Sequence, residues 1–319
     1  MSILRVSLFG KFHVQLGEQV LAGLNARKVQ ELFCYLLLYR DRPHPRETLA
    51  SLLWGDRSTA QSKRYLRKAL WRLQVTLDCQ TRPSHNRILL VEPDWVQLNS
   101  DANLWLDVAV FEHAFTLVQG VPGKELDFQR VETVRNAMDL YQGDLLEGWY
   151  QDWCLYERER LQHRHAAMLD KLMDYCQAHH EYETGLAYGA RILRYDRARE
   201  CTHRQLMRLQ YLAGNRTAAL RQYERCLTAL DEELGVRPTK RTVALYEQIR
   251  ADQLHGPTPA PVEASITPRV LTSSLPEILG RLQRLEVILA DIQRQVQQDI
   301  QVVERALNDQ PYTEHRLPK

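Results

Sequence analysis

The chain has 319 residues, of which 44% are hydrophobic and 26% are charged, and this composition is typical of a soluble globular protein with two domains and an appendage. No run approaches the roughly 18 apolar residues of a membrane span, which excludes a transmembrane protein. The net charge of +2 conceals an asymmetry, because residues 1–100 carry 15 Lys and Arg against 8 Asp and Glu. Positive charge confined to one region is expected if only that region meets a polyanion.

The first ten residues, MSILRVSLFG, alternate like a β-strand and lack the apolar core of a signal peptide. The cysteines are scattered and contain no CxxC pair, which favours reduced core thiols over a disulfide or zinc framework. We therefore expect a cytoplasmic protein that does not associate with membranes. The six cysteines are Cys34, Cys79, Cys154, Cys176, Cys201 and Cys226.

The chain begins with short extended segments. Residues 3–16 alternate well enough for two strands that break at Gly10-Lys11, and a third extended piece follows near Val20. A buried helix is expected over 26–39, with Asn25 as its N-cap. Arg27 and Lys28 fall in its first turn, where positive charge opposes the helix dipole. DNA phosphate would relieve that conflict, although an ordinary exposed pair is the alternative.

The next segments predict two further helices and a hairpin. Pro43 and Pro45 interrupt the chain, and a short helix is expected over 46–54. A second helix, over 60–77, is followed by a hairpin over 87–99 with its turn at Glu92-Pro93-Asp94.

The helix over 60–77 carries the main functional signal. At 100° per residue its four leucines fall within about 60° of one another, which gives one narrow apolar stripe. The same 18 residues contain five cations and no acid. A solvated helix usually mixes charges of both signs, whereas a helix in a DNA major groove needs cations and amides on its outer face. A basic solvated face is the alternative interpretation.

The order strands, helix, helix, basic helix and hairpin is that of a winged helix-turn-helix with an N-terminal sheet. The basic helix would read DNA, and the hairpin would be the wing. Trp71 could pack on a sugar or the phosphate backbone, and a core role is equally compatible with the pattern. We expect base contacts from Gln61, Arg64, Arg67 and Lys68, phosphate contacts from Lys63, Arg72, Arg27 and Lys28, and at most a backbone contact from Arg87 in the wing.

The middle of the chain contains helical repeats. Residues 181–193 and 215–227 superpose at a period of 34, and the positions of Gly214, Ala219 and Tyr223 are those of a tetratricopeptide repeat. Such helix pairs bury their apolar faces only by stacking, and the resulting arrays bind proteins or peptides. A purely architectural role is the alternative. The matching pairs are Leu172 with Leu206, Leu186 with Leu220, Ile192 with Cys226 and Leu193 with Leu227.

Several long motifs occur in order along residues 1–251. The first part contains LFGKFHV, ARKVQELFCYLLLYRDRPHPRETLASLLWGD, ALWRL and VQLN; the second contains DVAVFEHAF, YQGDLLEGWYQDW, ERERL and AGNRTAALRQYERCLTALDEELGVRP. The first set resembles the DNA-binding half of SARP-type transcriptional activators, whose winged helix is of the OmpR class. The second set resembles the bacterial transcriptional activator domain of those proteins. The resemblance implies binding to promoter double-stranded DNA and recruitment of RNA polymerase.

The C-terminal region has a different pattern. A Pro, Ser and Thr-rich linker over 256–274 precedes a helix over 275–308, and residues 309–319 form a tail without an organised pattern. Apolar residues recur in 4-3 alternation, which predicts a coiled coil and a homo-oligomer formed through 278–307. An amphipathic helix that folds back onto the repeats is the alternative. The apolar positions are Ile278, Leu282, Leu285, Leu289, Ile292, Val296 and Val303.

No catalytic or cofactor motif is evident. There is no phosphate-binding GxxxxGK[ST] loop, no GxSxG and no HExxH, and His163 and His165 do not share a helix face. We therefore expect no enzyme, no cofactor and no metal.

The predicted fold is mostly α: a winged helix over 1–100, a TPR-like activator domain over 101–255 and a C-terminal helix. The predicted function is sequence-specific regulation of transcription, and the family resemblance implies activation. A DNA-binding repressor and a protein-interaction adaptor that no longer reads DNA remain as alternatives.

Overall fold

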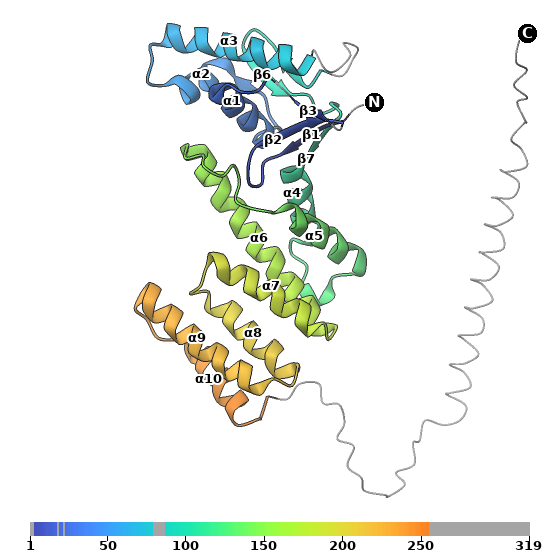
Figure 1. The fold of residues 1–319 in the computed structure, drawn as a ribbon, viewed down its shortest axis with the longest axis vertical. Coiled ribbons are helices and arrows are strands. Elements are labelled where there is room, and N and C mark those ends of the chain that lie inside the picture. Colours follow the sequence, from blue (N-terminus) through green and yellow to red (C-terminus); the bar gives the residue numbers. More distant parts are fainter. Residues whose placement is uncertain (1–2, 18, 22, 79–86, 255–319) are drawn as a thin grey trace, which may run out of the picture. The chain divides into compact units, whose positions relative to one another are not determined.

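The computed structural model describes residues 3–254 apart from 18, 22 and 79–86 (Figure 1). These residues are mostly helical and include two small sheets in the N-terminal part, as the sequence predicts. The predicted linker (256–274), C-terminal helix (275–308) and tail (309–319) lie outside the described residues, and so does Cys79.

The first sheet has four short strands in the order β3-β2-β1-β7. β1 (Leu4–Ser7) pairs antiparallel with β2 (His13–Leu16), which pairs with β3 (Gln19–Val20). These are the three extended segments expected from the sequence. β7 (Leu104–Leu106) was not predicted and pairs in parallel with β1. Because β7 lies beyond residue 100, the sheet includes residues from both predicted domains.

The second sheet contains the wing. β5 (Leu89–Val91) and β6 (Trp95–Leu98) form the predicted antiparallel hairpin. β4 (His44–Pro45) adds to the free side of β6 as an edge strand, where a proline that lacks an N–H is tolerated.

Three helices lie between the strands of the N-terminal part. α1 (Arg27–Leu38) is buried along most of its length, as its apolar sequence requires. α2 (Arg46–Trp54) has the predicted bounds, and α3 (Thr59–Asp78) is one residue longer at each end than predicted. The prediction of Asn25 as the cap of α1 is wrong, because the N-cap is Ala26 and no side chain caps this helix end.

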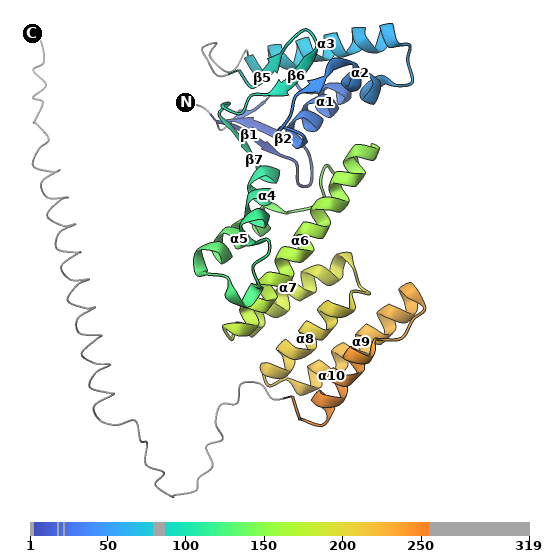
Figure 2. The same cartoon turned by 180° about the vertical axis from the view of Figure 1, so that it is seen from behind.

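The rest of the described chain is a series of helices that stack on one another (Figure 2). α6 packs against α7, α8 against α9, and α10 against both α8 and α9. The elements after β7 are α4 (Asp107–Val118), the short 3-10 helix η1 (Gly123–Glu125), α5 (Phe128–Leu140), α6 (Asp152–Ala178), α7 (Tyr182–Tyr195), α8 (Glu200–Leu212), α9 (Arg216–Leu234) and α10 (Lys240–Arg250).

The 34-residue repeat corresponds to this stacking. α6 with α7 and α8 with α9 are equivalent helix pairs, and the matched Leu172 and Leu206 are both buried. Ile192 and Cys226 are buried as well, whereas Leu227 is 37% exposed and departs from the pattern. At Gly189 a Cβ would come within 2.5 Å of a methyl carbon of Leu206, so this glycine allows α7 to approach α8 closely.

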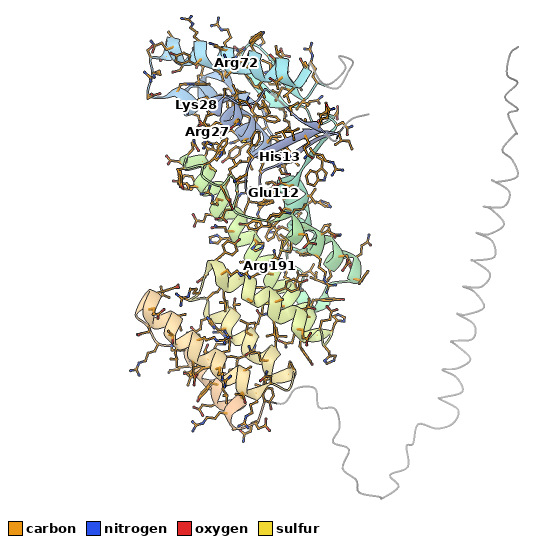
Figure 3. All side chains as sticks on the ribbon, viewed as in Figure 1. His13, Arg27, Lys28, Arg72, Glu112 and Arg191 are labelled. Carbon is orange, nitrogen blue, oxygen red and sulfur yellow. The ribbon has the colours of Figure 1, made fainter. Side chains whose placement is uncertain are left out.

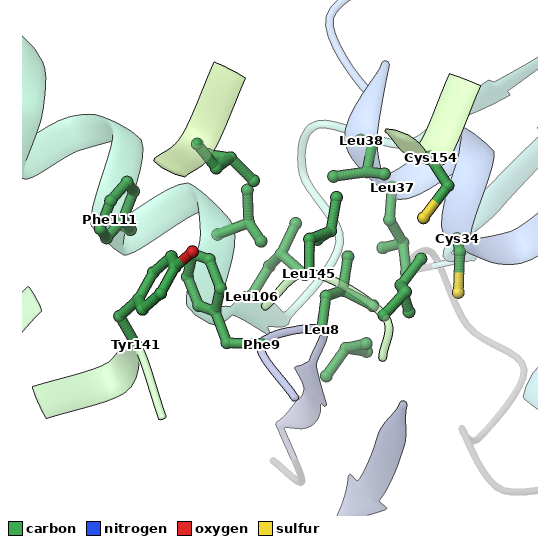
Figure 4. Packing of buried hydrophobic residues seen from close by; sticks show 14 of the residues in the cluster. Leu8, Phe9, Cys34, Leu37, Leu38, Leu106, Phe111, Tyr141, Leu145 and Cys154 are labelled. Carbon is green, nitrogen blue, oxygen red and sulfur yellow. The ribbon is translucent and has the colours of Figure 1, made fainter. Parts of the chain in front are cut away.

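One hydrophobic core runs from the first sheet into the repeats (Figure 4). The ring of Phe9 lies 5.1 Å from that of Phe111 on α4 and 4.7 Å from that of Tyr141. The backbone N–H groups of Leu8 and Phe9 both donate to the buried carboxylate of Asp107, at 2.7 and 2.9 Å. The winged helix and the helices as far as α8 therefore share one core. A second cluster, formed by Met207, Ala219, Leu245 and Ile249, holds α8, α9 and α10 together.

Candidate nucleic-acid interface

α3 is held in place by one apolar side. Leu66, Leu70, Leu73 and Leu77 are each at most 2% exposed, which confirms the predicted stripe. The buried Ser62 Oγ donates to the carbonyl oxygen of Trp54 at 2.7 Å and so ties the end of α2 to the start of α3. Ser62 was not singled out from the sequence, although its position on the apolar side of the helix was a usable signal.

The opposite side of α3 is exposed and basic. Arg64, Arg67, Lys68 and Arg72 are exposed and have no ion-pair partner in the part of the chain that the structure describes. The amide of Gln61 lies on the same side and is exposed as well. These are the groups that pair with phosphates and with guanine or adenine edges. The structure therefore brings five of the predicted contact residues onto one free helix surface.

The indole of Trp71 lies on this same surface and is 63% exposed. A core role, which the sequence left open, is therefore wrong. Val75, one turn further on, is 40% exposed, so the C-terminal half of the basic face has an apolar centre.

Lys63 is the exception among the predicted cations of α3. Its Nζ lies 2.5 Å from Oε1 of Glu47 in the first turn of α2. Hydrogen bonding and charge from Lys63 lower the pKa of the Glu47 carboxyl. Lys63 and Arg67 line a groove of about 760 Å³ between α2, α3 and the wing. A phosphate that binds Lys63 has to compete with Glu47.

The wing tip approaches the start of α2. Arg46 donates its backbone N–H to the Asp94 carbonyl at 2.9 Å and its Nη1 to the Glu92 carbonyl at 3.2 Å. Arg46 thereby positions the turn and was missed by sequence reasoning, which read it only as the first residue of a helix. Arg87 is exposed but lies at the other end of the hairpin, where its carbonyl accepts from Asn99. It is therefore separated from the tip along the length of the wing.

Arg27 and Lys28 are not part of the α3 surface. Figure 3 shows them beside the first turns of α6, whereas Arg72 projects from α3 on the far side of the winged helix. Lys28 Nζ lies 2.7 Å and Arg27 Nε 3.6 Å from the carboxylate of Glu31, which is buried. Glu31, one turn further along α1, supplies negative charge next to both cations, whether or not a DNA phosphate also approaches them. The guanidinium of Arg27 also stacks 3.8 Å from the ring centroid of Trp149.

Among the described residues no three His, Cys, Asp or Glu side chains are grouped as metal ligands would be. Five cysteines are described and free, four of them buried as expected and Cys201 exposed. No helix in the described ranges is long and apolar enough to span a bilayer.

Comparison with known proteins supports the predicted activator domain. Residues 106–250 match the family model of the bacterial transcriptional activator domain. The regulatory protein AfsR of Streptomyces coelicolor is 26% identical over 275 residues, which is 83% of this chain. The chain spans only 26% of the length of AfsR.

A solved structure shows a similar fold. Mycobacterium tuberculosis EmbR, determined in complex with a low affinity phosphopeptide, matches with a TM-score of 0.59 and 18% identity. The match covers 80% of this chain and 67% of EmbR, so it includes chain on both sides of residue 106.

The resemblance of the N-terminal motifs, the match over 106–250 and the similar architecture of EmbR agree with one another. Residues 106–250 therefore carry a bacterial transcriptional activator domain, and the chain as a whole resembles the SARP-type transcriptional regulators.

Proposed function

We propose that the protein binds promoter DNA in a sequence-specific manner, with α3 in the major groove, and activates transcription. The observation that carries this proposal is the exposed face of α3, where four cations and an amide have no partner among the described residues while the opposite side is buried. Uncompensated cations on a rigid helix match a polyanion, and Gln61 adds a group that can discriminate bases.

The residues on this face have different roles. Gln61, Arg64, Arg67 and Lys68 occupy the N-terminal half of α3, the part of a recognition helix that contacts base edges in helix-turn-helix proteins. Arg72 lies further along and is placed for phosphate, and Trp71 for a sugar or the backbone. Lys63 contributes less because Glu47 already neutralises it.

The match of residues 106–250 to the bacterial transcriptional activator domain supports the proposal that the protein activates transcription. Helices α6 to α10 form a stacked array of a kind that presents extended binding surfaces. We place the contact with RNA polymerase on these helices, and self-association in residues 278–307. The site of action is the cytoplasm.

The decisive experiment is selection of binding sites from random duplex DNA over a salt series. It compares the full chain with a double variant, Arg64→Ala with Lys68→Ala. The matched control is Arg194→Ala with Arg221→Ala, which removes two exposed, unpaired cations from α7 and α9. The wild type and the control are expected to select one motif, and the α3 variant to lose it, because each base-reading contact contributes about 1–3 kcal/mol.

If the wild type selects no motif and binds only weakly at physiological salt, DNA reading by α3 is wrong. The adaptor alternative would then explain the family resemblance, with the helical array as the functional surface.

A further inference from the structure

A second cationic site lies in the helical array. α6, α8 and α10 line a groove of about 520 Å³. Its walls are mainly polar and include Arg204, Gln205 and Arg208 from α8, Arg241 and Gln248 from α10, and Asp174 from α6. None of these residues belongs to the winged helix, so the groove is distinct from the proposed DNA interface.

Two of the three arginines in this groove are uncompensated. Arg204 is satisfied, since its Nη1 lies 3.0 Å from Thr242 Oγ1 and 3.5 Å from Glu200 Oε1. Arg208 and Arg241, in contrast, have neither a hydrogen bond nor an ion pair with any residue that the structure describes.

The nearby carboxylates are already engaged. Both oxygens of Asp170 accept from the guanidinium of Arg199, at 2.9 and 2.8 Å. Asp174 accepts from Gln205 Nε2 at 2.5 Å, and burial raises its pKa. The amide of Gln205 is neutral, so Asp174 keeps its charge, but the three arginines that line the groove outnumber its two aspartates, Asp170 and Asp174, and Arg199 already pairs with Asp170. The groove therefore keeps an excess of positive charge.

The local electrostatics of Arg208 point the same way. Burial and the charges of Arg204 and Arg241 lower the pKa of its guanidinium, and Asp174 opposes this only in part. Like charges held together at a partly desolvated site are costly, and a bound anion relieves that cost.

We propose that this groove binds an acidic segment of a partner protein, whose carboxylates pair with Arg208 and Arg241. The guanidinium fork matches a carboxylate in a bidentate manner. The amide of Gln248 and the free amide oxygen of Gln205 can bond to a peptide backbone, and the exposed Ala244 offers an apolar contact within the same groove. The inference rests on the proposed function in one respect, namely that the partner of the activator domain docks on its helices.

The test uses the full chain and a fluorescein-labelled hexaglutamate peptide, with binding followed by fluorescence anisotropy at low salt. The variant Arg208→Gln with Arg241→Gln is expected to weaken binding about tenfold or more, because two charge-assisted contacts are lost. Arg194→Gln with Arg221→Gln removes the same charge from α7 and α9 and is expected to bind as the wild type does. Arg64→Ala with Lys68→Ala should also bind as the wild type does, which excludes binding of the peptide to α3.

Three results would overturn the inference. The wild type could fail to bind the peptide, or the groove variant could bind it as well as the wild type. Inorganic phosphate could also displace the peptide at an equal concentration of charge, which would assign the groove to a free anion. Each of these outcomes is independent of site selection on DNA, so the failure of one proposal is distinguishable from the failure of the other.

Discussion

At the scale of single residues, His165 is unusual because it is buried within α6. Its ring stacks on that of Tyr141 with 4.1 Å between centroids, and Nε2 has no hydrogen-bond partner among the described residues. Burial and the charge of Arg191 lower the pKa of His165 to about 4, and Asp144 opposes the shift. The ring is therefore neutral in the folded protein at pH 5, where an unfolded chain would protonate it.

This difference predicts the pH dependence of stability. As the pH falls from 6.5 towards 4, the unfolded state gains a proton that the folded state does not, so the free energy of unfolding decreases. Between pH 7.5 and pH 5, protonation of His165 in the unfolded state should lower the free energy of unfolding by about 2 kcal/mol. Urea unfolding at the two pH values should show a smaller loss for His165→Phe than for the wild type. An equal loss in both proteins would contradict the assignment.

The pairing of charged residues is the part that the sequence could not predict. Arg27 and Lys28 were correctly placed in the first turn of α1, but their partner Glu31 was not recognised. Local spacing shows that Glu31 is within reach, yet it does not show that Gln151, 120 residues later, donates to the same carboxylate at 2.9 Å. Side-chain partners of this kind depend on tertiary packing, which periodicity does not encode.

At the scale of elements, long helices and strands could be predicted from the sequence, whereas some of the shortest strands could not. α3 could be predicted because five turns of helix give a repeated apolar stripe. β4 and β7 were missed because each has only two or three residues and exists through pairing with a distant strand. The buried stripe of α3 determines which residues lie on its exposed side, so most of the candidate site was predictable. The pairing of Lys63 with Glu47 was not predictable, because it depends on how α2 packs against α3.

The α3 surface makes a prediction about counterion release. A cation that contacts phosphate adds about one to the slope of log K against log salt. Arg72→Gln should therefore reduce the slope by about one. Lys63→Gln should reduce it by less, because Glu47 competes for the ammonium group.

Arg27→Gln provides the contrast within the winged helix, since this residue pairs with Glu31 on the side away from α3. The Arg27→Gln variant should leave the slope of log K against log salt unchanged when binding of the selected duplex is measured between about 50 and 200 mM salt. A reduction as large as that for Arg72→Gln would mean that DNA reaches α1.

At the scale of the whole described chain, a charge network connects the two parts. Arg40, after α1, lies 2.7 Å from Glu112 on α4, and the same carboxylate accepts from Arg160 and Arg164 of α6. Burial raises the pKa of Glu112, but hydrogen bonds and charge from Arg40 and Arg160 outweigh it and hold the pKa below its ordinary value. The network reinforces the shared hydrophobic core, so movement of the winged helix against the repeats would break both.

A double-mutant cycle can measure this coupling between the two parts. Arg40→Gln, Glu112→Gln and the combined variant should give an interaction energy of about 1–3 kcal/mol in urea unfolding, because both side chains are more than two-thirds buried. The matched cycle on Arg197 and Glu232, an exposed pair 3.2 Å apart, should give less than about 1 kcal/mol. Because one core extends from the winged helix into α8, tryptophan fluorescence and far-ultraviolet circular dichroism should report the same transition in each variant. Separate transitions would show that the winged helix and the repeats unfold independently, and equal coupling energies in the two cycles would contradict the stronger coupling expected for the buried pair.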